Sequence, residues 1–195
     1  MKTICLGALL GCLVAAAALA RVAPAPAAPS CAATPSGAPV FQAWGDSADY
    51  VLAGGGSFEP GAPGWSLSGG AAVGAGGDPF GVAGSGSQSL TLPAGASATS
   101  ACLKAPHDRA IVRFALRGVT PGAVLHVEVL VNGGKEVLDL GTVAPTSSDW
   151  AVSDVLQADW PLSSNGAVQL QVRLTSVGSG TAQVDDVFVD PYMAR

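Results

Sequence analysis

The chain has 195 residues, of which 49% are hydrophobic and only 12% charged, and 26 glycines and 14 prolines interrupt it. This composition favours many turns and short strands over long helices. The formal net charge of −5 disfavours nucleic acid as a partner, because phosphate groups repel an acidic surface, and the sequence offers no polybasic patch for anionic lipid.

The first 27 residues have the organisation of a secretory signal peptide. Lys2 precedes an uncharged, mostly apolar run over residues 4–20, and Ala25-Pro26-Ala27 fits the small-x-small rule for cleavage after Ala27. A retained membrane anchor and a lipoprotein box at Leu9-Leu10-Gly11-Cys12 are the alternatives. We predict a secreted, extracellular protein. Its mature net charge would be −7, since Lys2 and Arg21, two of the 9 basic residues, leave with the signal.

Residues 28–40 are rich in Pro, Ala, Ser and Gly, which predicts an extended leader before a domain over residues 41–195. Cys31 and Cys102 remain after export, and an even pair in an oxidising compartment predicts one disulfide. That bond would close a loop of 102 − 31 + 1 = 72 residues. In the chain-entropy model, such a loop is worth roughly 4 kcal/mol. Two free thiols are the alternative.

Aromatic residues open the predicted domain, and a glycine-rich stretch follows them. Phe41 and Trp44 are expected to close an open end of the core, with ligand binding by Trp44 as the alternative. Residues 54–65 predict a bent loop that leads into a short strand at Trp65-Ser66-Leu67. Residues 69–87 lack the GxGxxG spacing of a phosphate-binding loop, so we expect a flexible connection there.

From Ser89 onward, apolar and polar residues alternate with the period of two that is typical of strands. Strands are predicted over residues 89–92, 98–103, 109–117, 125–131, 137–140 and 168–174. Asn132-Gly133 predicts a hairpin turn. A second hairpin is expected to turn at Pro121-Gly122 and to bring residues 109–117 beside 125–131. Residues 150–157 form the one stretch where a helix competes with a strand.

The last predicted strand runs from Gln183 to Asp190 and stops at Pro191. Strict alternation places Val184, Asp186, Phe188 and Asp190 on one face and Asp185, Val187 and Val189 on the other. Asp185 would then be the single carboxylate on an apolar face, where it needs a cation or hydrogen-bond donors. About nine strands with one apolar face each predict an all-β fold, a two-sheet antiparallel β-sandwich closed by this last strand.

Three segments resemble the galactose-binding-like jelly roll: Gly56-Ser57-Phe58-Glu59, Gly64-Trp65 and Gln183-Val184-Asp185-Asp186-Val187. The resemblance spans roughly residues 50–192, and the whole string is also similar to exported proteins of high-GC bacteria. Many secreted carbohydrate-binding modules share this fold, so the resemblance implies a binding module. It also implies a structural calcium ion at Glu59 and Asp185, with Asp186 as the alternate ligand, because Ca²⁺ takes about six to eight oxygens. The alternative is Asp185 accepting backbone hydrogen bonds and Glu59 in solvent.

The sequence contains none of the common hydrolase or metalloenzyme motifs. GxSxG, HExxH and Cys/His metal spacing are all absent, and its two histidines, His107 and His126, lie in a loop and on a strand. We therefore expect a protein that is not an enzyme; a catalytic triad assembled in space from distant residues is the alternative.

Planar polar side chains are expected to gather on one outer sheet face, where they could hydrogen-bond sugar hydroxyls. They are Arg113, His126, Glu128, Gln171 and Arg173. Each has ordinary cross-strand pairing as its alternative. Trp160 is the expected aromatic platform, with Trp150 second and packing over an open end as the alternative. The expected partner is a polysaccharide or cell-surface glycan; the alternative is a structural or protein-binding role in the cell envelope.

Overall fold

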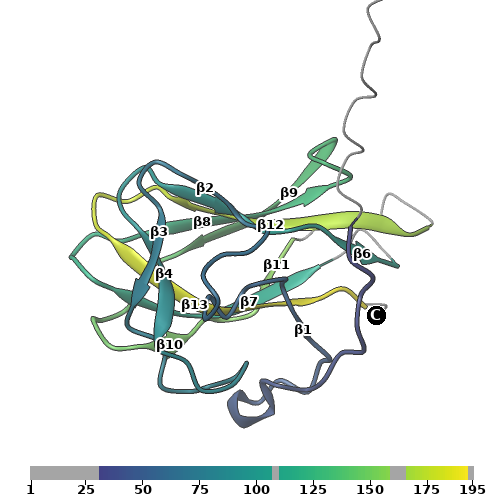
Figure 1. Ribbon diagram of the computed structural model, residues 1–195, viewed down its shortest axis with the longest axis horizontal. Coiled ribbons are helices and arrows are strands. Elements are labelled where there is room, and N and C mark those ends of the chain that lie inside the picture. Colours follow the sequence, from purple (N-terminus) through teal and green to yellow (C-terminus); the bar gives the residue numbers. More distant parts are fainter. Residues whose placement is uncertain (1–30, 107–109, 159–165, 193–195) are drawn as a thin grey trace, which may run out of the picture.

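The computed structural model describes residues 31–106, 110–158 and 166–192. Two antiparallel sheets face each other as the layers of a β-sandwich, which confirms the predicted fold class (Figure 1). The short 3-10 helix η1 (Gln42–Trp44) is the one helix in these ranges. None of the described helical structure has the length or hydropathy of a membrane-spanning segment.

Each sheet is built from strands that are distant in the sequence. Sheet 1 has the order β10-β7-β13-β4-β3, with β1 beside β13 and β11 beside β7. Its strands are β1 (Val51–Leu52), β3 (Ala72–Ala75), β4 (Gln88–Leu92), β7 (Ile111–Gly118), β10 (Ala151–Val152), β11 (Leu156–Gln157) and β13 (Ala182–Asp190). Sheet 2 has the order β2-β5-β12-β8-β9, with β6 beside β12. Its strands are β2 (Ser66–Ser68), β5 (Ser97–Thr99), β6 (Leu103–Ala105), β8 (Leu125–Val131), β9 (Glu136–Val143) and β12 (Val168–Ser176).

The core between the sheets follows the predicted alternation closely in sheet 2. Every second residue of β8 and β12 is buried, and the residues between them are partly or fully exposed. Phe114 of β7 and Leu90 of β4 meet these side chains from sheet 1 and have no exposed surface. Because one face of each strand is dry, a register slip of one residue would expose the whole apolar set.

The turn at Pro121-Gly122 does not form the expected hairpin. β7 pairs with β13, β10 and β11, whereas β8 pairs with β12 and β9, so residues 119–124 carry the chain from one sheet to the other. The Asn132-Gly133 hairpin is confirmed: β8 and β9 pair across it, and both residues have the positive φ angles that this type of turn requires.

One further expectation is wrong in the described part of the chain, and one alternative that the sequence left open is decided. The glycine-rich stretch 69–87 contains β3, which pairs with β4. Residues 150–157 do not form a helix; they contain β10 and β11, which both pair with β7. In each case the segment is too short to show a period, and pairing with a longer strand decides its conformation.

The predicted alternation of the last strand is wrong beyond Asp185. The pairing of β13 with β7 shifts between Asp185 and Phe188, and Asp186 has a φ angle of +48°. This is the geometry of a β-bulge, in which one extra residue reverses the facing of everything that follows. Val187 and Val189 therefore join Val184 in the core, as the burial of all three shows.

The N-terminal segment covers the outer face of sheet 1. The predicted disulfide between Cys31 and Cys102 is confirmed, and Ala32 forms a bridge with Leu103. Residues 31–40, expected as a leader, thus contact the sandwich. The side chains of Phe41, Tyr50, Ile111 and Phe188 pack into a second apolar cluster on this face. The expectation that Phe41 closes an open end of the core is wrong: its side chain is fully buried, but in this second cluster on the outer face of sheet 1.

Candidate functional site

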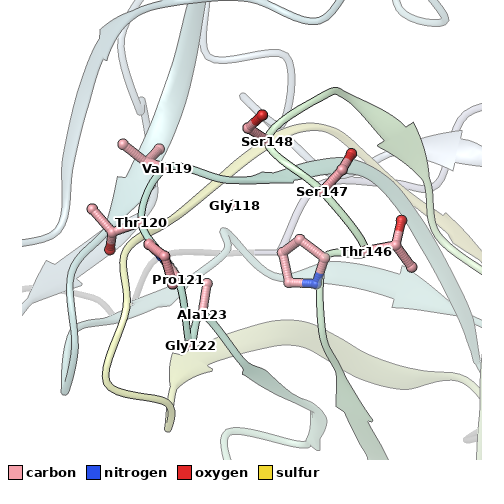
Figure 2. Close-up of a pocket in the computed structure, with 10 residues that line it drawn as sticks. Gly118, Val119, Thr120, Pro121, Gly122, Ala123, Thr146, Ser147 and Ser148 are labelled. Atoms are coloured by element: carbon pink, nitrogen blue, oxygen red, sulfur yellow. The ribbon is translucent and has the colours of Figure 1, made fainter.

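A pocket of about 270 Å³ opens at the end of the sandwich where the chain passes between the sheets. Residues 118–123, after β7, form one wall, and residues 145–148, between β9 and β10, form the other. Figure 2 shows Thr120 and Pro121 facing Thr146 and Ser147 across this space. None of the lining residues carries a charge, so this end pocket suits a small neutral ligand.

Hydroxyl groups give the end pocket its polar character. The Thr120 hydroxyl accepts a hydrogen bond from the backbone N–H of Thr181 at 2.8 Å, and the Ser147 hydroxyl accepts one from Asp149 N–H at 3.0 Å. The hydroxyls of Thr146 and Ser148 have no hydrogen-bond partner among the described residues, and both side chains are exposed. These two groups are free to bond a polar ligand. Nothing in the sequence pattern pointed to them, because two chain connections bring them to the pocket.

The loop between β12 and β13 supports one wall of the end pocket. Gly180 N–H donates to the carbonyl of Gly122 at 3.0 Å, and Val119 N–H donates to the carbonyl of Thr181 at 2.8 Å. A Cβ atom on Gly180 would collide with backbone atoms of Thr120, Pro121 and Ala123. Only a residue without a side chain permits this backbone-to-backbone approach.

We therefore expect Gly180→Ala to lower the free energy of unfolding by about 2 kcal/mol, because the added methyl group overpacks the loop. Gly74→Ala is the matched control: a Cβ at Gly74 has nothing within 4 Å, and Gly74 lies in β3. Urea denaturation of both variants measures the difference. Equal stability of the two variants would show that the loop between β12 and β13 adjusts to the added methyl group and does not support the wall of the end pocket.

The outer face of sheet 2 brings together four of the predicted ligand residues. Strand register aligns a polar row across five strands: Ser66, Thr99, Arg173, Glu128 and Asp139. Arg173 donates two hydrogen bonds to the Glu128 carboxylate, at 2.6 and 2.7 Å, and the pKa of Glu128 is lowered chiefly by them. We call this row, with its neighbours His126 and Gln171, the polar row.

Most side chains of the polar row are paired within the protein. His126 Nε2 lies 2.8 Å from the Asp139 carboxylate, and Gln171 donates to the carbonyl of Ser100 at 2.9 Å. Hydrogen bonds from Gly141 N–H and from His126 lower the pKa of Asp139. The row is thus pre-ordered, but a ligand would have to share or displace these contacts.

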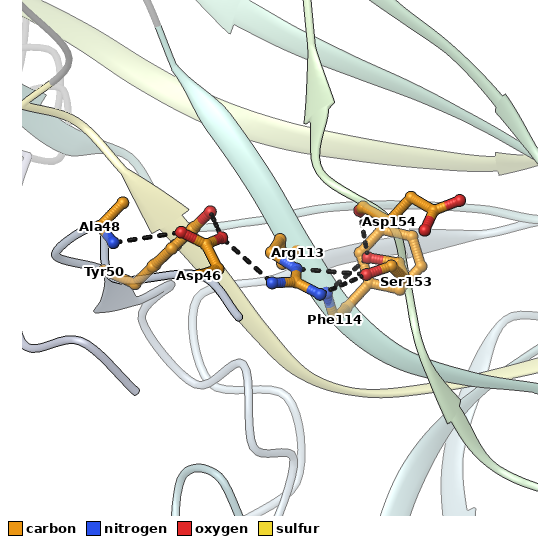
Figure 3. A network of polar contacts seen from close by, with 7 residues as sticks. All are labelled: Asp46, Ala48, Tyr50, Arg113, Phe114, Ser153 and Asp154. Carbon is orange, nitrogen blue, oxygen red and sulfur yellow. Dashed lines mark hydrogen bonds and ion pairs between the residues drawn. The ribbon is translucent and has the colours of Figure 1, made fainter. Parts of the chain in front are cut away.

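Arg113 does not belong to that face, which corrects the prediction. It lies in β7 of sheet 1, is 5% exposed, and points toward the N-terminal segment (Figure 3). Its Nε and Nη2 atoms donate to the carbonyl of Ser153 at 3.1 and 2.8 Å, and Nη1 donates to Asp46 at 3.0 Å. The guanidinium also lies 4.6 Å from the centre of the Phe41 ring. The period of two showed which way Arg113 faces within its strand but not which sheet holds that strand.

Asp46 is the acceptor that makes burial of Arg113 tolerable. Its carboxylate also accepts from the Tyr50 hydroxyl at 2.7 Å and from Ala48 N–H at 3.1 Å. Burial alone would raise the pKa of Asp46, but these hydrogen bonds and the charge of Arg113 outweigh it and hold the pKa below its ordinary value. Burial and the bond to Asp46 raise the pKa of Tyr50. The network fastens the N-terminal segment to sheet 1 and keeps the guanidinium of Arg113 buried, away from a ligand in solvent.

Three buried carboxylates meet beneath the glycine-rich loop. Oxygen atoms of Asp78, Asp185 and Asp186 lie within 4.8 Å of one another, and all three residues are buried. Neighbours on a regular strand face opposite ways, but the bulge in β13 lets Asp185 and Asp186 share one side. Burial, as the largest cause, raises the pKa of Asp185 to about 7 and that of Asp186 to about 6.

Backbone donors satisfy part of this carboxylate cluster. Asp185 accepts from Asp78 N–H at 3.1 Å and from its neighbour Asp186 N–H at 2.9 Å, while Asp186 accepts from Ala83 N–H at 2.8 Å. The sequence pointed to Asp185 and Asp186 but missed Asp78. The signal available was an aspartate followed by proline inside a glycine-rich stretch, which marks a tight turn.

Glu59 lies beside the same loop but outside the carboxylate cluster. One of its oxygens accepts from the N–H groups of Ser87 and Gln88, at 2.7 and 2.8 Å. Glu59 therefore holds the end of the loop, where β4 begins. Two other residues named from the sequence, His107 and Trp160, lie outside the described residues, as does the predicted signal peptide.

Comparison with solved structures finds carbohydrate-binding modules of the β-sandwich fold. One similar structure is a family 22 module joined to the GH10 module of a Clostridium thermocellum xylanase, complexed with xylohexaose. It has a TM-score of 0.50 and 14% identity over 69% of this chain, which spans 27% of that one. A family 61 module with β-1,4-galactotriose has a TM-score of 0.46 and 18% identity over 71% of this chain and 96% of its own. The xylan-binding family 22 domain of Paenibacillus barcinonensis Xyn10C has the same score and identity, over 71% and 93%.

Identities this low show the fold and leave the ligand open. No protein-family model matches the chain. No curated protein matches it either.

Proposed function

We propose that this protein is an exported, non-catalytic carbohydrate-binding module whose end pocket holds a neutral sugar residue. One observation carries the proposal: the end pocket is concave, uncharged and lined by hydroxyl groups, of which those of Thr146 and Ser148 are unpaired among the described residues. The proline rings at positions 121 and 145 supply apolar surface for the carbon face of a sugar. A pocket of about 270 Å³ accommodates one sugar ring with its water, not a long chain segment.

The polar row on sheet 2 is proposed as the second place where a glycan makes contact. Arg173, Glu128, His126 and Gln171 offer planar groups of the kind that hydrogen-bond sugar hydroxyls, and their mutual bonds already fix their orientation. Trp160 is retained as a proposed aromatic platform. Export is supported by the paired cysteines, since disulfides persist in oxidising compartments.

Calorimetric titration with β-1,4-galactotriose and with xylohexaose, preceded by a screen of neutral and acidic glycans, tests the proposal. Thr146→Val and Ser148→Ala each remove one unpaired hydroxyl, and we expect each to weaken binding about five- to tenfold, since a hydrogen bond contributes about 1 kcal/mol. Ser85→Ala, an exposed serine in the loop before β4, is the matched control.

Three outcomes discriminate between the surfaces. Loss of binding in the two pocket variants supports the end pocket, whereas loss only in Arg173→Gln moves the site to the polar row. If the wild-type protein binds no glycan in the screen but binds a protein partner saturably, the structural or protein-binding role in the cell envelope replaces sugar binding.

We also propose that a structural Ca²⁺ ion binds at the carboxylate cluster. Three carboxylates without a nearby cation repel one another in a buried site, and oxygen ligands of this kind are those that Ca²⁺ prefers. Such an ion would hold the loop over residues 78–83 against β13, and it would take no part in chemistry.

A further inference from the structure

Two exposed aromatic rings meet on the segment that covers sheet 1. Trp44 is 40% exposed and Phe80 is 36% exposed, and their ring centres lie 5.6 Å apart at an interplanar angle of 81°. No other aromatic contact in the described part of the chain joins two exposed rings. We call this pair the aromatic corner. It corrects the expectation that Trp44, like Phe41, fills the edge of the core.

Both rings are held in place by buried structure. Trp44 N–H donates to the carbonyl of Phe41 at 2.8 Å, and the buried Phe41 ring packs edge-on against Trp44. Phe80 N–H donates to the carboxylate of Asp78 at 2.7 Å, within the carboxylate cluster. Large rings held rigidly in solvent forgo the stabilisation that burial would bring, which indicates a surface kept for a ligand.

The rim of the aromatic corner is small and uncharged. Its chain neighbours Gln42, Ala43 and Gly45 are exposed, and Gly81 follows Phe80. Asp46, two residues after Trp44, is paired with Arg113 of β7, and Asp78, two residues before Phe80, is buried. A charged ligand would therefore find no exposed, unpaired counter-charge at these two positions, and a protein partner would need an interface of roughly 1,000 Å² or more, far beyond two side chains.

Trp44 also retains a free hydrogen-bond donor. Its indole N–H has no partner among the described residues, whereas that of the buried Trp65 donates to the carbonyl of Gly54 at 2.8 Å. A flat apolar ring with a donor at its edge, beside a second ring standing upright, matches a sugar ring. The ring would stack through its C–H face while a hydroxyl accepts from the indole.

We infer that the aromatic corner is a second saccharide-binding site, which contacts a neutral polysaccharide together with the end pocket. This inference rests on the proposed function in its ligand class, but the two sites share no residue. On a repeating polymer, two sites in one chain raise the apparent affinity because the second contact becomes intramolecular. Because the two sites share no residue, loss of either ring leaves the lining of the end pocket unchanged.

Adsorption isotherms on microcrystalline cellulose, insoluble xylan and insoluble β-1,4-galactan test the inference, beside calorimetry with β-1,4-galactotriose and xylohexaose. We expect Trp44→Ala and Phe80→Ala each to lower affinity for the adsorbing polymer about tenfold and to leave oligosaccharide binding unchanged. Trp44→Phe keeps a flat ring and should retain most of the affinity. Val155→Ala is the control, since Val155 is an exposed apolar side chain between β10 and β11 and belongs to none of the proposed sites.

The outcomes separate this inference from the proposed function. Polymer isotherms of Trp44→Ala that match the wild type overturn the aromatic corner and leave the end pocket standing. If Trp44→Ala loses polymer binding and the wild type binds no oligosaccharide, the aromatic corner is supported and the end pocket is overturned. Wild-type protein that binds neither overturns both. An unchanged melting temperature in each variant excludes misfolding as the cause.

Discussion

Replacing Asp46 by alanine is expected to lower the free energy of unfolding by about 3 kcal/mol, because it leaves the guanidinium of Arg113 buried without its partner. The Arg113 side chain is only 6% exposed, so water cannot solvate the charge in place of the carboxylate. The same change removes the acceptor for the Tyr50 hydroxyl. Chemical denaturation at neutral pH measures the loss. Asp49→Ala, an exposed neighbour in the same segment, should change stability by no more than about 0.5 kcal/mol.

A second substitution distinguishes a buried charge from lost packing. In the Asp46→Ala background, Arg113→Met removes the unpaired charge and keeps an unbranched apolar side chain at this position, so part of the lost stability should return. If the double variant is less stable than Asp46→Ala alone, and the further loss equals that caused by Arg113→Met in the wild type, the idea is wrong. The network would then contribute through packing and not through its ion pair.

With calcium removed by a chelator, the protein is expected to lose about 3 kcal/mol of stability as the pH rises from about 5 to about 8. Burial raises the pKa of Asp185 to about 7 in the folded protein, from an ordinary value of 3.8. The folded state therefore binds more protons than the unfolded state in this range, so the stability that Asp185 contributes is present at pH 5 and is lost as pH rises through 7. The pKa values of Asp46 and Glu128 are lowered, so these two carboxylates become protonated, and their contribution to stability is lost, only below this pH range.

Calcium should remove that loss, because a cation between the carboxylates replaces the protons. At a calcium concentration about 100-fold above its dissociation constant, binding to the folded state alone adds about 2.7 kcal/mol. Asp78→Asn is a sharp control: both backbone bonds of Asp78, from Phe80 and Gly81, end on one oxygen, which asparagine keeps. The variant should show a smaller pH dependence and weaker stabilisation by calcium. A melting temperature that ignores calcium in the wild type, at pH 5 and at pH 8 alike, would remove the ion from the proposal.

Several features followed from the sequence by itself. Alternation in β8 and β12 predicted strands and the side that faces the core, because the pleat of a strand makes facing a local property. The pair Asn132-Gly133 predicted its hairpin because positive φ angles are a property of those two residues. The Cys31–Cys102 disulfide followed from a count, since removal of the predicted signal peptide would leave only these two cysteines.

Only the tertiary structure decided which of these strands share a sheet. Residues 119–124 join β7 to β8, and a connection of this kind allows either a hairpin or a passage between sheets; the pairing of β7 with β13 selects the second. That selection buries Arg113 against Asp46, separates it from Glu128 and Arg173, and opens the end pocket between two such connections. The bulge at Asp186 likewise depends on register against β7, and it alone brings Asp185 and Asp186 to Asp78. The side of a strand on which a residue lies is a local property that the sequence predicts, whereas the pairing between strands is a property of the whole chain.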